Sequence, residues 1–244
     1  MIYNTARYNL RSSIMKEKKN LKYLEREKNW IYWALIFVSG FYGAYTVMLK
    51  GGVFCNAQTA NFVLFSISLG KGEWFKALYY LIPMSAYFLG AVVSEILPDT
   101  FKEKFIVSWD TALILFEMVL ILVIGALPDS VPHQISQVTI NFICSMQYNT
   151  FRQAEGVPMA TTFCTNHLRQ TGVAVAHCLK HCDDAAKTQV IIHIRMLLFF
   201  VLGAGVSALV CRYVGGKTIW LTVIPLGVVF IDLLNADIKK VEAN

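Results

Sequence analysis

Apolar residues along the chain come in long blocks, without the alternating pattern of a strand or the 3.6-residue pattern of a soluble helix. A hydrocarbon layer about 30 Å thick is crossed by about 20 helical residues. Five blocks come close to that length, at 30–49, 75–97, 105–127, 191–211 and 219–234. A sixth block, 135–151, is shorter and more polar. The pattern therefore predicts an all-α integral membrane protein, built as a polytopic helix bundle.

Two further segments begin with polar side chains and then become apolar. They read "NAQTANFVLFSISL" at 56–69 and "TTFCTNHLRQTGVAVAHCL" at 161–179. The stretches 53–69 and 160–179 are long enough to cross a membrane, yet their heads are rich in amides and hydroxyls. Each is either a full span or a re-entrant segment. The bundle then has six spans plus two re-entrant or short helices, or else eight spans.

The two polar-headed segments belong to a weak internal repeat. Residues 40–44 precede 145–149 by 105 positions, Gly-Val at 52–53 precedes Gly-Val at 156–157 by 104, and residues 59–61 precede 165–167 by 106. The halves are a first membrane repeat at 30–127 and a second at 128–244. Four spans per half make parallel repeats, whereas three spans plus a re-entrant segment make inverted ones. We prefer the inverted arrangement, because it places the loop 128–133, which lacks Lys and Arg, outside.

Composition agrees with this class: 56% of the residues are hydrophobic, 16% are charged and the mean hydropathy is +0.50. Soluble domains carry about 25% charged residues. Much of the net charge of +6 lies in residues 1–29, a basic arm with no signal-peptide cleavage site. We interpret it as a cytoplasmic arm, either an amphipathic helix on anionic lipid or a solvated tail. Its charge suits the lipid bilayer as partner, and we find no nucleic-acid module.

Lys and Arg in the loops set the expected orientation. Both the six-span and the eight-span arrangement place most of these residues on the side of the arm and both termini on that same side. We therefore expect a multi-pass protein of the cell membrane, inner or plasma, with both termini cytoplasmic. The six cysteines are scattered, so a disulfide framework is not indicated.

Several short motifs resemble a known family. "GFYGA" at 40–44, "GGVF" at 51–54 and "TAN" at 59–61 in the first half, with "MQYN" at 146–149 and "TNH" at 165–167 in the second, are similar to motifs of the YoaK-like family of largely uncharacterised bacterial membrane proteins. The resemblance implies a multi-spanning architecture and small-molecule transport. Gly43 stands where the family usually has Asp, Ala60 and Asn166 replace glycines, and His167 replaces an Asn. Any function of that Asp therefore cannot be carried over.

Polar side chains in the repeated segments are the candidate substrate ligands. An unpaired amide or backbone group in hydrocarbon costs several kcal/mol, so these groups need partners. They either join helices by hydrogen bonds or line a central cavity in which interrupted helices present polar ends to a solute. Their occurrence at matched positions of both halves favours the cavity. The predicted substrate-binding residues are Gln58, Thr59, Asn61, Gln147, Asn149, Thr165, Asn166 and His167.

Ionisable residues within apolar blocks are rare and mark functional positions. Glu117 falls in the middle of "ALILFEMVLIL", and Asp110 lies near the start of the same block. We expect Glu117 either to pair with a cation such as Arg169 or Arg195, or to handle a proton or cation. Glu117 and Asp110 are therefore the candidates for proton or ion coupling. Arg152 and Arg169 would attract an anionic solute.

The run "AHCLKHCDD" places His177 and His181 one helical turn apart, and Cys178 and Cys182 likewise. Such spacing can bind zinc or another transition metal. However, the two pairs point about 100° apart on a helix. We favour an ordinary helix end over a metal site, and we expect no metal and no cofactor.

Three functional classes remain. A secondary transporter or channel for a small solute explains the repeats, the paired polar heads and Glu117 together, and it is the preferred hypothesis. The alternative is a membrane scaffold or sensor that does not transport. An enzyme is the least favoured, because the sequence has no GxSxG or HExxH motif, and the lack of a Walker motif argues against ATP coupling. The solute is not identified by the sequence, and assembly as a homodimer is left open.

Overall fold

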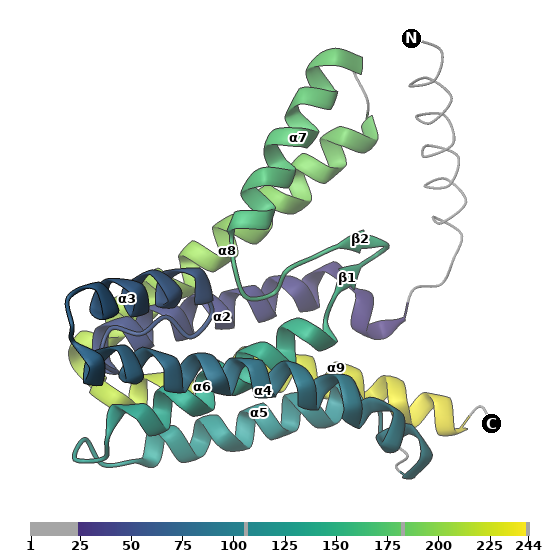
Figure 1. Ribbon diagram of the computed structural model, residues 1–244. Coiled ribbons are helices and arrows are strands. Elements are labelled where there is room, and N and C mark those ends of the chain that lie inside the picture. The colour runs from purple at the N-terminus through teal and green to yellow at the C-terminus, as the bar shows by residue number, and fades with distance from the viewer. Residues whose placement is uncertain (1–23, 105–106, 182–183, 243–244) are drawn as a thin grey trace.

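A computed structural model describes residues 24–104, 107–181 and 184–242 and has the predicted all-α bundle (Figure 1). Residues 1–23 of the basic arm lie outside this part of the chain. A 3-10 turn, η1, covers Glu25–Glu27. The helices of the first half are α2 (Asn29–Leu49), α3 (Gln58–Gly70), α4 (Trp74–Lys104) and α5 (Trp109–Ala126). Those of the second half are α6 (His133–Thr150), α7 (Thr165–His181), α8 (Asp184–Val214), η2 (Gly215–Thr222, 3-10) and α9 (Val223–Glu242).

The five apolar blocks correspond to α2, α4, α5, α8 and η2 with α9. Within the described ranges, four helical stretches are long and apolar enough to cross a membrane: Asn29–Leu49, Trp74–Phe101, Trp109–Ala126 and Asp184–Glu242. The last stretch contains both α8 and α9, which are connected by η2. The sixth block forms α6, whose buried face carries polar side chains such as Gln137 and Asn141.

Each of the two polar-headed segments begins with non-helical chain and becomes helical only afterwards. Residues 53–57 are not helical, and α3 begins only at Gln58. In the second half, a short hairpin of β1 (Gln153–Ala154) and β2 (Val157–Pro158) and a non-helical stretch precede α7. Gly51 and Gly52 adopt φ of +75° and +74°, a backbone region open mainly to glycine, and so turn the chain directly after α2.

The bundle is held by a few helix pairs. α2 packs on α8, α4 packs on α6, and α5 packs on α9 and η2, while α3 lies on α4 and α7 lies on α8. Glycines allow the closest approaches: a Cβ on Gly40 would meet the Phe200 carbonyl, and one on Gly203 would meet the Phe37 carbonyl. Small residues at such crossings are typical of helix packing in lipid.

Two ends of the bundle can be distinguished in Figure 1. The start of α2, the α4–α5 connection, the β1–β2 hairpin and the end of α9 lie at one end, here called the terminal end. The turn after α2, the α5–α6 connection and η2 lie at the other. α7 and the first part of α8 project from the body as a helical hairpin. Large apolar side chains such as Phe88, Val119 and Leu198 are exposed along the outer helices, as expected of surfaces that face lipid.

Candidate functional site

The polar head of the first half is folded around Asn61. Its side-chain oxygen accepts a hydrogen bond from the Phe54 N–H at 3.1 Å, and its Nδ2 donates to the Phe54 carbonyl at 2.6 Å. Asn61 is fully buried. Its amide is the hydrogen-bond partner of both backbone groups of Phe54, which lies outside any helix or strand. We call this contact between residues seven positions apart a clamp. It holds the non-helical stretch against the first turn of α3.

Neighbouring amides fix this head to the bundle. Asn56 donates to the Ser39 carbonyl of α2 at 2.9 Å, and Gln58 donates to Asn141 Oδ1 of α6 at 2.8 Å. Gln58 also accepts from Asn61 at 3.0 Å. These contacts explain why amides begin an otherwise apolar segment: Asn61 supplies partners to the non-helical backbone, and Asn56 and Gln58 join the head to α2 and α6.

The second half repeats the carbonyl contact of the clamp with a different side chain. His167 Nε2 lies 2.7 Å from the Ala160 carbonyl, seven residues earlier, which is the separation between Asn61 and Phe54. His167 Nδ1 lies 3.0 Å from Nδ1 of His193 on α8. Both imidazoles are buried, with 0% and 2% of their surface exposed.

The starts of α3 and α7 line one cavity of about 500 Å³, which we call the head cavity. Its walls come from both halves and from α4, and the lining residues are Asn56, Ala57, Gln58, Thr59, Tyr87, Phe163, Thr165, Asn166 and Arg169. Four of the predicted ligands, Gln58, Thr59, Thr165 and Asn166, are therefore brought together. Asn61 and His167 sit behind the wall as the two clamps.

The head cavity has a positive electrostatic character. Arg169 is the charged residue in its lining, and its guanidinium donates to Asn166 Oδ1 at 3.2 Å. α3 begins at the cavity, and Ala57 before it supplies no capping side chain. α7 also begins there, at Thr165. The first N–H groups of a helix lack intrahelical partners and carry its partial positive charge.

Two of the predicted ligands lie elsewhere. Gln147 is buried on α6, and within the described chain both polar atoms of its amide lack a hydrogen-bond partner. Asn149, the second-last residue of α6, donates to Ser94 and Glu95 at 3.0 Å and accepts from Arg152 at 2.7 Å. It belongs to the terminal end, because α6 runs away from the heads of α3 and α7.

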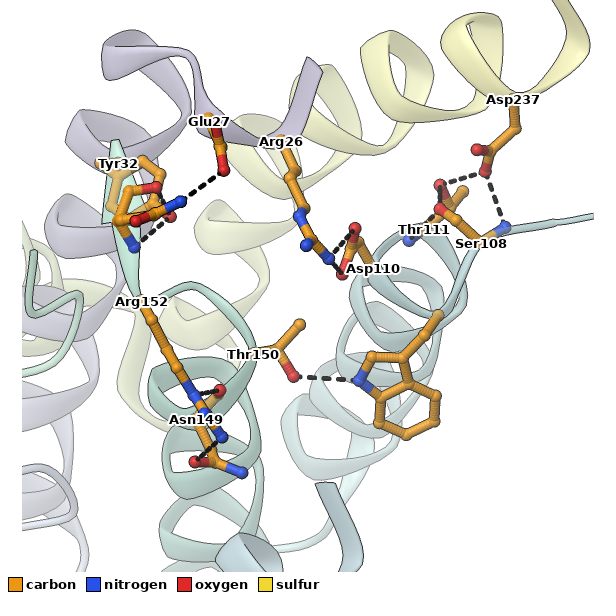
Figure 2. A network of polar contacts seen from close by, with 12 residues as sticks. Arg26, Glu27, Tyr32, Ser108, Asp110, Thr111, Asn149, Thr150, Arg152 and Asp237 are labelled. Carbon is orange, nitrogen blue, oxygen red and sulfur yellow. Dashed lines mark hydrogen bonds and ion pairs between the residues drawn. The ribbon is translucent and has the colours of Figure 1, made fainter. Parts of the chain in front are cut away.

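Asn149 lines a second space of about 670 Å³, here called the terminal cavity, together with residues of η1, α4, α5 and α9. Figure 2 shows its polar network. Arg26 contacts both oxygens of Asp110 at 3.0 and 3.1 Å, and Asp237 accepts from the Ser108 N–H and the Thr111 hydroxyl. The predicted coupling residue Asp110 is thus ion-paired with a residue at the end of the basic arm.

Glu117 is fully buried on α5, and the Tyr42 hydroxyl donates to its Oε1 at 3.0 Å. Its Oε2 has no hydrogen-bond partner among the described residues. The arginines considered as its partners lie elsewhere: Arg169 is at the head cavity, and Arg195 lies over the Trp33 ring at 5.2 Å. Of the two alternatives for Glu117, the ion pair with Arg169 or Arg195 is not formed, and a tyrosine hydroxyl is its partner.

The weak metal candidate is described only in part. His177 and Cys178 lie on α7, while the His181 side chain and Cys182 fall outside the described residues. Over the described ranges, three or more His, Cys, Asp or Glu side chains do not gather in a group able to hold a metal ion.

Some lining residues were missed by sequence reasoning. Asn56 belongs to the same polar run as Gln58, and this run is a sequence signal that could have identified it. Tyr87 stands inside an apolar block of α4, and Phe163 is an aromatic residue in the second polar head; neither carries a signal that separates it from ordinary packing residues.

The apolar helices and their outward apolar faces define an α-helical, multi-helix membrane protein. The chain belongs to the family described as Protein of unknown function (DUF1275), whose model matches residues 31–231. The match covers all the helices that line the head cavity. No curated protein and no solved structure matches the chain.

Proposed function

We propose that this protein is a transporter for a small solute, a secondary transporter or a channel-like one, with its binding site in the head cavity. The observation that carries the proposal is the cavity itself, which is lined by the starts of α3 and α7 at matched positions of the two sequence halves. Polar helix ends that meet between two repeats are the usual construction of a transporter's solute site.

Inverted repeats are part of the proposal. If the two halves are equivalent, α2, α3 and α4 correspond to α6, α7 and α8. The pair α2–α8 then corresponds to α6–α4, and the pair α3–α4 corresponds to α7–α8. In all four pairs the helices pack together. α2 runs away from the terminal end and α6 runs toward it, and α5 and α9 show the same opposition (Figure 1). The two seven-residue clamps add a local match. These features support six spans with α3 and α7 as re-entrant helices, in keeping with the YoaK-like resemblance.

This topology has a direct test. With both termini cytoplasmic, a cysteine at Ser130 in the α5–α6 connection is expected to react with an impermeant thiol reagent added outside cells, and one at Lys240 only after the membrane is opened. The experiment uses a background in which the native cysteines are replaced. Labelling of both positions from the same side would contradict inverted repeats and favour parallel ones.

The lining favours a solute with one negative group. Arg169 and the positive ends of α3 and α7 face the cavity, and the described residues that line it include no carboxylate. Amides and hydroxyls of Gln58, Thr59 and Thr165 supply further hydrogen bonds, and Tyr87 and Phe163 supply aromatic surface. A small organic monoanion, such as a monocarboxylate, fits this chemistry better than a cation or a polyanion.

The test uses purified protein in detergent and a panel of acetate, benzoate and the neutral analogue benzamide. A solute that binds the folded state raises the Tm. We expect benzoate to raise it more than benzamide, and Thr59→Val and Thr165→Val each to weaken benzoate binding about 5-fold, as the loss of one hydrogen bond predicts. Thr139→Val, on α6 outside this cavity, is the matched control.

Uptake of labelled benzoate into proteoliposomes separates transport from binding alone. Transport predicts uptake that falls in the same two variants and persists in Thr139→Val. If Thr59→Val and Thr165→Val lower only the Tm and leave binding and uptake unchanged, the polar heads serve packing and the scaffold or sensor hypothesis is preferred.

A further inference from the structure

The hydrogen bonds of the His167–His193 pair fix the position of one proton. A carbonyl oxygen can only accept, so Nε2 of His167 carries the proton donated to Ala160. In the neutral pair, Nδ1 of His167 is then a bare acceptor, and Nδ1 of His193 donates to it across 3.0 Å. Nε2 of His193 is left without a proton. In the neutral pair, each imidazole therefore has one defined tautomer.

This pair can take up one proton without losing either hydrogen bond. The added proton leaves His167 with hydrogens on both nitrogens, and His193 moves its own hydrogen to Nε2, so that its Nδ1 becomes the acceptor. A second proton would place hydrogens on both Nδ1 atoms at 3.0 Å and break the contact. The pair therefore has a capacity of one proton in this geometry.

The pair lies directly behind the wall of the head cavity. His167 is the third residue of α7, between the lining residue Asn166 and the lining residue Arg169 two positions later. The titratable group that contacts each imidazole is the other imidazole, and the two arginines nearest to the pair in sequence have other contacts. Arg169 donates to Asn166, and Arg195 lies over Trp33.

A proton on this pair is opposed while the cavity holds no anion. Burial disfavours the charged imidazole, and the positive start of α7 and the guanidinium of Arg169 repel it. An anion in the head cavity would offset the burial, the positive start of α7 and the charge of Arg169. It would place a negative charge beside the same turn of α7 that carries His167. Protonation and anion binding would therefore strengthen each other by the same factor.

We propose that the His167–His193 pair is a proton-binding site linked to the head cavity, so that one proton is taken up with each monoanionic solute. The inference rests on the proposed function, because it assigns a coupling ion to that site. The first half provides the comparison: Asn61 also donates to the carbonyl seven residues earlier, with an amide that does not titrate. Replacing His167 by Asn thus places in the second half the side chain that makes this carbonyl contact in the first.

Calorimetric titration of the full-length protein with benzoate, in buffers of different ionisation enthalpy, measures the protons taken up. Between the pH at which the free pair titrates and the higher pH at which the complex titrates, we expect about one proton per benzoate in the wild type and a Kd that rises about tenfold per pH unit. His167→Asn is expected to bind benzoate without proton uptake and with a Kd independent of pH. Benzamide, which is neutral, is expected to bind both proteins without proton uptake.

A second measurement needs no variant. The chain has five histidines, so nitrogen-15 spectra of the histidine-labelled wild type can follow each ring. Benzoate is expected to change one pair of rings from two neutral tautomers to a singly charged pair. If all five rings keep their protonation state when benzoate binds, the inference is wrong even should His167→Asn fail to fold.

The remaining outcomes are distinct. Benzoate binding without proton uptake in the wild type overturns the inference and leaves the proposed function intact. Absence of binding of acetate and benzoate at every pH overturns both. Proton uptake that is lost in Glu117→Gln and kept in His167→Asn overturns the inference as well, because it assigns the coupling to the carboxyl group beside Tyr42.

Discussion

The head cavity and the terminal cavity are similar in size, about 500 and 670 Å³, but they satisfy their polar groups in opposite ways. At the terminal end, charges are paired with each other: Arg26 with Asp110, and Arg152 with Glu95. At the head cavity, amides and an imidazole take up backbone groups, and Arg169 has an amide rather than a carboxylate as its partner.

In the terminal cavity, charged side chains pair with each other. In the head cavity, a cationic side chain is left for a ligand. At the terminal end, Arg26 and Arg152 already have carboxylate partners, so these two cations are less available to an anionic solute. The head cavity keeps one cationic side chain and two helix starts without a counter-charge in its lining. A ligand that supplies the missing charge would gain most there.

The largest effect is expected from breaking the first clamp. Asn61→Leu leaves the N–H and the carbonyl of Phe54 without their partner, and each unsatisfied buried group costs about 1–3 kcal/mol. We expect a loss of about 2–4 kcal/mol, measured by denaturation in detergent. Asn166→Leu, at the start of α7, removes no backbone partner and is the control. Equal losses in both variants would contradict the clamp.

A smaller loss is expected at the terminal end. Arg26→Gln leaves the buried Asp110 without its cation, but 42% of the Arg26 side chain is exposed and water screens the pair. We expect a loss of about 1 kcal/mol with unchanged benzoate binding. Adding Asp110→Asn is expected to restore most of the stability. Failure of the double variant to do so would mean that Arg26 acts through other contacts.

At the head cavity we expect the opposite result, a change in benzoate binding with little change in stability. Arg169→Gln removes the charged lining residue, and we expect about a tenfold weaker Kd for benzoate, about 1.4 kcal/mol, with little change in Tm. Benzamide binding serves as the internal control, because it lacks the charge. Equal weakening of benzoate and benzamide would show that the cavity does not select a negative group.

The smallest effect is expected from Arg152→Gln. Its ion pair with Glu95 has 59% and 65% of the two side chains exposed, and such surface pairs contribute little. We expect no measurable change in Tm or in benzoate binding. A clear loss of uptake in proteoliposomes would instead assign a functional role to the terminal cavity and remove the contrast between the two regions.

Sequence patterns were sufficient for the helices and for part of the site. The apolar blocks predicted α2, α4, α5, α8 and α9 because the length needed to cross hydrocarbon is a local property of the chain. Four residues of the polar heads were expected to line a site and do line the head cavity. Asn149 was grouped with them from its residue type, and its position at the terminal end depends on the direction of α6.

What the sequence determined by itself is therefore the membrane class, the helical content and the two polar heads. These follow from hydropathy and residue type, which act over a few turns of chain. The tertiary structure added which heads meet, the clamps of Asn61 and His167, the pairing of Arg26 with Asp110, and Tyr42 as the partner of Glu117. The residues in each of the last two pairs are 84 and 75 positions apart, and only the packing of helices against one another brings such distant groups within hydrogen-bonding reach.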